Sequence, residues 1–143
     1  MSSAAARALF TFVESFFTDY LRRQRGASDH TVRAYRDTLK LLFEFVAQRR
    51  SCDMASLEPK DLDADMIAAF LDHLETDRGN GAATRNARLA AVHAFARYAA
   101  SLHPEHLERC QRLLAVPFKR ACLRVVDYLD GDEIRALLDA PDR

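Results

Sequence analysis

The sequence predicts an all-α fold, a bundle of four helices with a short fifth helix. In four long stretches, apolar residues recur every three or four positions, which is the period of an amphipathic helix. Hydrophobic residues make up 49% of the 143-residue chain, which is enough for one good core, while the length is too short for two full domains. No stretch of useful length shows the apolar and polar alternation of a half-buried strand.

The first two helices are expected over residues 7–25 and 29–49. Gly26 separates them, because glycine adopts the left-handed conformation that ends a helix without steric cost. Ser28 then offers its hydroxyl to the free N–H groups of the second helix. The expected apolar faces are Leu9, Val13, Phe16, Phe17, Tyr20 and Leu21 in the first helix and Val32, Tyr35, Leu39, Leu42 and Val46 in the second.

Two further long helices follow an interruption at Pro59. Asp61 or Asp63 is expected to cap the third helix, and the glycines of the turn at residues 79–81 separate it from a fourth helix over residues 83–100. The many alanines of the fourth helix allow close approach to a neighbour. The expected core residues are Met66, Ile67, Phe70, Leu71 and Leu74 in the third helix, and Leu89, Val92, Ala96 and either Phe95 or Ala99 in the fourth.

The C-terminal part of the chain suggests a short helix, a linker and the beginning of a second unit. Pro104 suits the first turn of a fifth helix that ends near Leu114, before Pro117. We therefore expect a helical domain over residues 1–116 and a linker over residues 117–128. Residues 129–143 are expected to form the first helix of an otherwise missing domain.

Composition excludes several classes of protein. The three cysteines form no C-x-x-C pair and indicate neither a disulfide framework nor a zinc knuckle, and no cofactor is expected. No apolar run approaches the roughly 20 residues needed to cross a bilayer, and the N-terminus does not have the pattern of a signal peptide. We expect a cytoplasmic protein with no membrane partner and no small-molecule substrate.

The net charge of zero conceals a strong segregation of charge along the chain. Residues 1–50 carry a net charge of +4, residues 51–77 carry −7, residues 78–126 carry +7, and residues 127–143 carry −4. A polyanion responds to these blocks rather than to their sum, since salt confines the influence of each charge to about 8 Å. The basic blocks are therefore candidate surfaces for nucleic acid.

The order of the motifs resembles a known family. The phrases TFVESFFTDYLRRQRGASDHTVRAYRDTLKLLFEFV, DLDADMIAAFLDHL and GAATRNARLAAVHAFARYAA are similar to the N-terminal, SAM-like core-binding domain of tyrosine recombinases, the integrase and transposase superfamily. VPFKR followed by YLDGDEIRALLDAP resembles the passage into their catalytic domain. The resemblance implies a domain that closes one half of a clamp around duplex DNA, with other recombinase subunits as further partners.

The resemblance also implies that this chain is not an enzyme by itself. In the family, a tyrosine nucleophile and its arginine, lysine and histidine helpers lie in the C-terminal domain, and their motifs do not occur here. Tyr20, Tyr35 and Tyr98 have core-like spacing, and Tyr128 precedes the last segment. Cleaving a phosphodiester needs several cations converging on one phosphate, so none of these tyrosines is expected to be catalytic.

Binding of duplex DNA depends mainly on neutralising phosphates, so exposed basic residues at the beginnings of the second and fourth helices are the candidates. Helix N-termini add free N–H donors and a positive dipole. By resemblance, these two helices lie against the major groove. The candidates are Ser28, His30, Thr31, Arg33, Arg36 and Lys40 in the second helix, Thr84, Arg85, Asn86 and Arg88 in the fourth, and Lys119 and Arg120 in the linker.

Simpler interpretations stand beside this one. In the second helix, Arg33 and Lys40 have acidic residues four positions later and are able to form ordinary surface pairs. In the fourth helix, by contrast, no acidic residue lies between Arg78 and Arg97, so its arginines are expected to have no local partners. The linker cations are equally compatible with a merely soluble connection.

The histidines and the acidic block also allow more than one interpretation. His103, His106 and Cys110 have spacings compatible with metal ligands but lack a fourth ligand, and His93 is expected to be a core or boundary residue. The acidic block is expected to face away from DNA or to receive a basic patch of a neighbouring subunit. The alternative function is a helical interaction module that self-associates through its oppositely charged blocks.

Overall fold

A computed structural model describes residues 3–120 of the chain. Residues 121–128 of the linker expected at 117–128, and the helix expected at 129–143, lie outside the described residues. The described part is helical throughout its regular elements, as the sequence predicted. Its elements are α1 (Ala4–Ser15), η1 (Phe16–Gln24), α2 (Asp29–Arg50), η2 (Met54–Ser56), η3 (Pro59–Asp61), α3 (Ala64–Thr76), α4 (Ala82–Leu102), η4 (Pro104–His106) and α5 (Leu107–Leu114).

The first predicted helix consists of two segments of different winding. The α-helix α1 begins at the Ser3 cap and runs into η1, a π-helix with wider turns. The backbone N–H of Arg25, for example, donates to the carbonyl of Tyr20 at 2.9 Å, five residues earlier. Gly26 then adopts a φ of +58°, as expected for the residue that ends this helix. The apolar period predicted the helix but not its change of winding.

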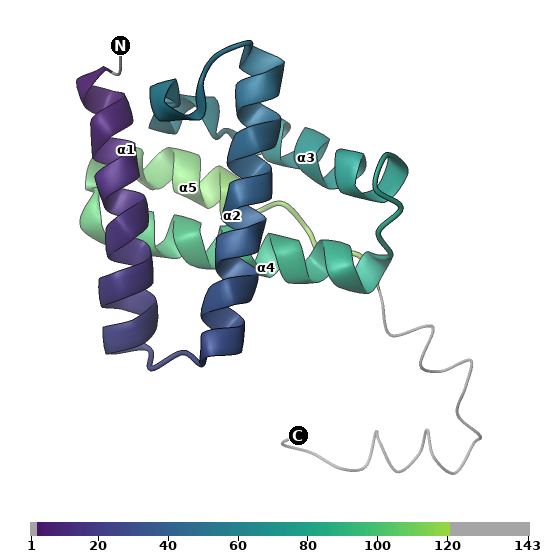
Figure 1. Cartoon of the computed structure of the whole chain (residues 1–143), viewed down its shortest axis with the longest axis horizontal. Coiled ribbons are helices and arrows are strands. Elements are labelled where there is room, and N and C mark those ends of the chain that lie inside the picture. The colour runs from purple at the N-terminus through teal and green to yellow at the C-terminus, as the bar shows by residue number, and fades with distance from the viewer. Residues whose placement is uncertain (1–2, 121–143) are drawn as a thin grey trace.

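The helices form two crossing layers (Figure 1). The segment α1–η1 and helix α2 lie side by side as a hairpin, and α3, α4 and α5 run across it. Helix α4 is the common partner, since it packs against α5, α2, α3 and η1. The region where α4 meets these neighbours contains the core.

The predicted core is largely confirmed. All five residues expected in α3 are buried, and its cap is Asp63, whose carboxylate accepts a hydrogen bond from Met66 N at 2.8 Å. Asp61 instead accepts from the N–H of Glu58. In α4, Phe95 is buried and Ala99 only partly so. Further buried residues include Leu9, Phe16, Leu21, Val32, Leu39, Leu42, Val46, Leu89, Val92, Ala96 and Tyr98.

Aromatic rings pack the hairpin of α1–η1 and α2 against α4. The ring of Phe16, fully buried at the start of η1, lies 5.2 Å from that of Phe95 and 5.8 Å from that of Tyr98, centroid to centroid. Tyr20 and Tyr35 are partly buried in the same cluster, and the hydroxyl of Tyr98 is hydrogen-bonded to that of Ser15. The core-like placement expected for these tyrosines is confirmed.

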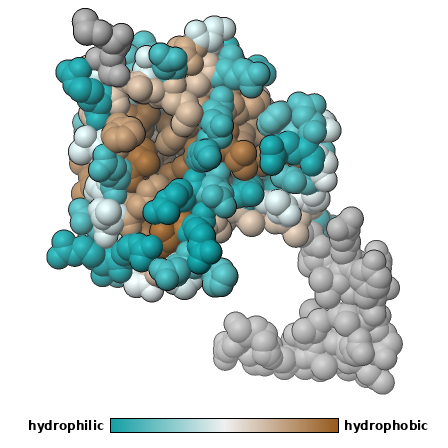
Figure 2. Space-filling model, in the orientation of Figure 1, coloured by the Kyte–Doolittle hydropathy of each residue, from teal (hydrophilic) through white to brown (hydrophobic). Residues whose placement is uncertain are grey.

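Part of the apolar surface remains open between α1 and α2. Hydrophobic side chains gather there, while hydrophilic ones follow α2 down the visible face (Figure 2). The hollow is lined by Leu9, Phe10 and Val13 together with Phe43, Met54 and Leu57. Phe10 is 65% exposed at this place, whereas Phe16 on the same hairpin arm is 0% exposed.

His93 is a buried polar residue of α4. It is 4% exposed, and the ring of Phe118 stands edge-on to it at 5.0 Å. Burial, followed by the nearby charge of Arg97, lowers the pKa of this imidazole. The expectation of a core or boundary histidine is confirmed, and the neutral form is the one that suits the fold.

Replacing the two phenylalanines of the hairpin arm tests the core assignment. Phe16→Ala is expected to lower the free energy of unfolding by about 3–5 kcal/mol, because it leaves a cavity among packed rings. Phe10→Ala removes the same atoms from an exposed position and is expected to change it by less than about 0.5 kcal/mol. Urea denaturation followed by circular dichroism measures both values, and equal losses would contradict the assignment.

His93 predicts a specific dependence of stability on pH. Its folded-state pKa is depressed, so its contribution is complete above the unfolded pKa of roughly 6.5 and is lost as the pH falls and the unfolded chain takes up the proton first. Between about pH 7.5 and about pH 5, the melting temperature of the wild type should therefore fall further than that of His93→Gln. Parallel pH profiles for the two proteins would refute this role.

Candidate nucleic-acid interface

The first half of α2 presents its basic side chains to solvent. Arg33, Arg36 and Lys40 are exposed, and their spacing of three and four residues places them on one side of the helix. Within residues 3–120, the ion pairs Arg33–Asp37 and Lys40–Glu44 do not form, so the simple surface-pair interpretation is wrong for the described chain. The guanidinium of Arg36 lies 5.6 Å from the centre of the Phe17 ring.

The beginning of α2 is capped as predicted. The Ser28 hydroxyl accepts a hydrogen bond from the N–H of Thr31 at 3.2 Å and lies 3.1 Å from the Thr31 hydroxyl. Asp29 forms an ion pair with Arg22 at 3.1 Å. Ser28 and His30 remain exposed, while Thr31 is partly buried. One of the N–H donors that were expected to be open to a phosphate is therefore already occupied within the chain.

Arg85 differs most from expectation. It is only 7% exposed, its Nε lies 3.1 Å from Oε1 of Glu75, and its Nη1 donates to the carbonyl of Pro117 at 3.3 Å. The prediction that it has no local partner is wrong, because the partner comes from the preceding helix. The contact of Arg85 with DNA stays a prediction. In the described structure this side chain is buried and its guanidinium already has partners within the protein.

Arg88 has a different partner. Its Nη1 donates to the hydroxyl of Thr38 at 2.9 Å, and that buried hydroxyl donates in turn to the carbonyl of Ala34 at 3.0 Å. The expectation that Arg88 has no partner is also wrong, although its partner is neutral. This contact joins the second turn of α4 to the middle of α2. The two helices that carry the candidate residues therefore meet here.

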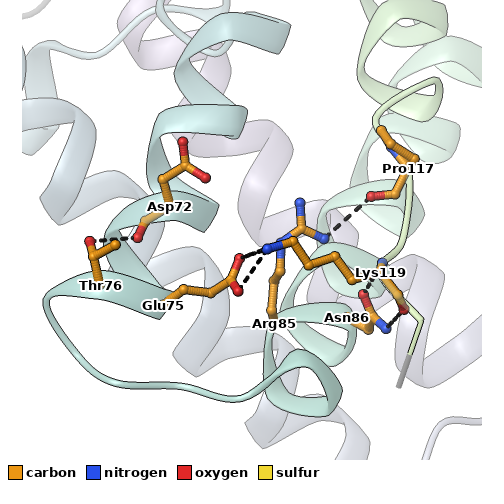
Figure 3. A network of polar contacts seen from close by, with 7 residues as sticks. All are labelled: Asp72, Glu75, Thr76, Arg85, Asn86, Pro117 and Lys119. Carbon is orange, nitrogen blue, oxygen red and sulfur yellow. Dashed lines mark hydrogen bonds and ion pairs between the residues drawn. The ribbon is translucent and has the colours of Figure 1, made fainter. Parts of the chain in front are cut away.

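The chain that follows α5 returns to the beginning of α4 and is held there (Figure 3). The amide of Asn86 donates to the main-chain carbonyl of Lys119 at 2.5 Å and accepts from its N–H at 2.8 Å. The ammonium of Lys119 lies 2.8 Å from both carboxylate oxygens of Glu75. Hydrogen bonding from Lys119, followed by the charges of Lys119 and Arg85, lowers the pKa of Glu75.

The predicted candidates thus fall into three groups. Ser28, His30, Arg33, Arg36, Lys40, Thr84, Lys119 and Arg120 are exposed; Thr31, Asn86 and Arg88 are partly buried; and Arg85 is buried. The exposed positions include the three basic candidates of α2, Arg33, Arg36 and Lys40. Those at the beginning of α4 are mostly committed to contacts within the protein.

Two residues that organise this region, Glu75 and Thr38, were not among the candidates. A sequence signal existed for Glu75. It lies four residues before Gly79, and Arg85 lies four residues after Gly81, so a helical hairpin turning at residues 79–81 brings the two together. Thr38 had no such signal, because its contact with Arg88 spans fifty residues.

The histidines and cysteine near α5 take part in ordinary contacts. Among residues 3–120, no group of three histidine, cysteine or acidic side chains is arranged to hold a metal ion. His103 lies 3.6 Å from the carboxylate of Glu105, and Cys110 is buried with a raised pKa. No helix in the described part of the chain is both long and apolar enough to span a membrane.

Comparison with known proteins places these features in a family. Residues 13–103 match the family described as "Phage integrase, N-terminal SAM-like domain". The chain is similar to a protein of Sinorhizobium fredii named as an integrase/recombinase (y4rC), with 45% identity over 95% of the chain and 41% of the relative. It is also similar to the tyrosine recombinase XerC of Pelotomaculum thermopropionicum, with 29% identity over 94% of the chain and 42% of that protein.

The matches cover nearly all of this chain but only part of each relative. The chain spans less than half the length of either relative. No solved structure matches the chain. The family match covers helices α2, α3 and α4 in full and begins within α1. On this evidence the chain belongs to the family of phage integrase N-terminal SAM-like domains.

Proposed function

We propose that this chain is the DNA-binding N-terminal arm of a site-specific tyrosine recombinase and grips duplex DNA at the recombination site. The observation that carries the proposal is the row of exposed cations Arg33, Arg36 and Lys40 on one side of α2. A row spaced at one helical turn suits successive phosphates, and each phosphate neutralised releases counterions.

The beginning of α4 supplies the second part of the proposed surface. Thr84 is exposed in its first turn, and the Arg88–Thr38 contact fixes this end of α4 against α2. The proposal assigns the phosphate contacts mainly to the exposed cations of α2, to Lys119 and to Arg120. Arg85 and Arg88 act as residues that position the surface, because their guanidinium groups already have partners in the chain.

We further propose that the chain does not cleave DNA by itself. Tyr20, Tyr35 and Tyr98 are engaged in the aromatic cluster. The hydroxyl of Tyr98 is hydrogen-bonded to Ser15, and that of Tyr20 accepts from a single guanidinium, that of Arg25, at 3.4 Å, whereas cleavage needs several cations on one phosphate. In this proposal strand cleavage and assembly with other subunits belong to the full-length recombinase. The relatives' names and their greater length support that division.

Self-association through opposite charge blocks has less support. The acidic block finds basic partners inside the same chain, with Asp61 paired to Arg50 at 3.5 Å and Glu75 paired to Arg85 and Lys119. Carboxylates that are engaged in this way have less charge to offer to a second copy. No contact in the described part of the chain favours the interaction module over DNA binding.

A charge-matched pair of triple variants tests the proposal. Replacing Arg33, Arg36 and Lys40 with alanine should weaken binding to a duplex and reduce the slope of log affinity against log salt by about 0.9 for each phosphate that is no longer neutralised. The measurement is fluorescence anisotropy with a labelled duplex at several salt concentrations.

The control variant replaces Arg23, Lys60 and Arg112 with alanine. These cations are exposed and lie in ion pairs outside the proposed surface, so the same charge is removed elsewhere. This control should retain most of the affinity and of the salt slope. Equal losses in the two triple variants, or absence of binding by the wild type at low salt, would remove the proposed function.

A further inference from the structure

The contacts around Glu75 divide into a fixed part and an exchangeable part (Figure 3). Arg85 is the fixed partner, since its side chain is 9% exposed and also holds the carbonyl of Pro117. Lys119 is the exchangeable partner, since its side chain is 52% exposed and its ammonium reaches Glu75 from outside. The carboxylate of Glu75 therefore contacts two cations, and only that of Lys119 is accessible to a polyanion.

The main chain of Lys119 does not depend on its ammonium. Asn86 holds both the N–H and the carbonyl of this residue, and Arg85 holds the carbonyl two residues earlier. The side chain is thus able to leave Glu75 while its backbone stays beside the first turn of α4. Glu75 keeps Arg85 as a partner in that event, so no carboxylate is left buried without a counter-charge.

Resting on the proposed function, we propose that Glu75 is a built-in competitor of DNA phosphate for Lys119. In the free protein the carboxylate holds the ammonium through both of its oxygens. In the proposed complex, the ammonium of Lys119 contacts a phosphate of the duplex by giving up its contact with Glu75. Competition from Glu75 lowers the affinity of this site for any polyanion.

The variant Glu75→Gln tests the competition, and Asp72→Asn is its matched control. Asp72 lies one turn earlier on α3, and in the described part of the chain its carboxylate contacts neither Lys119 nor Arg85 (Figure 3). Anisotropy titrations use a mixed-sequence duplex of about 30 base pairs at low salt. Glu75→Gln should tighten binding by between about twofold and fivefold, the range of an exposed ion pair, and by more than Asp72→Asn.

Lys119→Ala completes the cycle. In the Glu75→Gln background, Lys119→Ala should abolish the gain in affinity for the duplex. In the wild-type background the same change should lower the affinity by a smaller factor than it does in the Glu75→Gln background, because Glu75 already competes for the ammonium. Equal gains from Glu75→Gln and Asp72→Asn would mean that only net charge matters, and a loss of affinity in Glu75→Gln would mean that the carboxylate positions the site. Either result overturns the competition while the wild type still binds DNA; a wild type that does not bind overturns the proposed function itself.

A measurement on the wild type keeps the proposal testable if Glu75→Gln does not fold. In NMR titration with the same duplex, the Lys119 side-chain ammonium resonance should shift, and the Asn86 side-chain amide should stay in place. An unmoved Lys119 ammonium in a saturated complex contradicts the exchange. Simultaneous loss of the Asn86 signal contradicts the fixed backbone.

Discussion

The enclosure of α4 by its neighbours is the constraint on which the rest of this structure depends. The helix packs against α2, α3, α5 and η1, and its middle is lined by small residues such as Ala91, Ala94 and Ala96 that let the other helices approach. A helix covered on so many sides has few positions at which a charged side chain reaches water. The polar groups that it carries must find partners on the helices that cover it.

This constraint determines which cations are available to a ligand. Arg85 finds Glu75 of α3, and Arg88 finds Thr38 of α2, so each guanidinium contributes to holding a neighbouring helix on α4. Removing a partner from a buried charge is costly, and both contacts are therefore better suited to positioning than to exchange with phosphate. The cations of α2 belong to a helix with one open side and remain accessible.

The sequence predicted the helices and the core better than the polar contacts. The apolar period of α3 identified all five of its buried residues, because burial in a helix repeats with a known spacing. The π-type winding of η1 was not predicted, since it preserves the same apolar stripe. The partners of Arg85 and Arg88 were missed because a search for nearby acidic residues in the sequence does not see across a hairpin or between α2 and α4.

Folding also changes the meaning of the charge blocks. In the sequence, residues 51–77 form a strongly acidic stretch between two basic ones. In the structure, Asp61 and Asp63 accept hydrogen bonds from backbone N–H groups, and Glu75 is shared by two cations. The surface charge that a polyanion meets comes from the charged side chains that have no such partner within the chain. At a screening length of about 8 Å, a few exposed cations of α2 that have no carboxylate partner in the described chain therefore matter more than a net charge of zero.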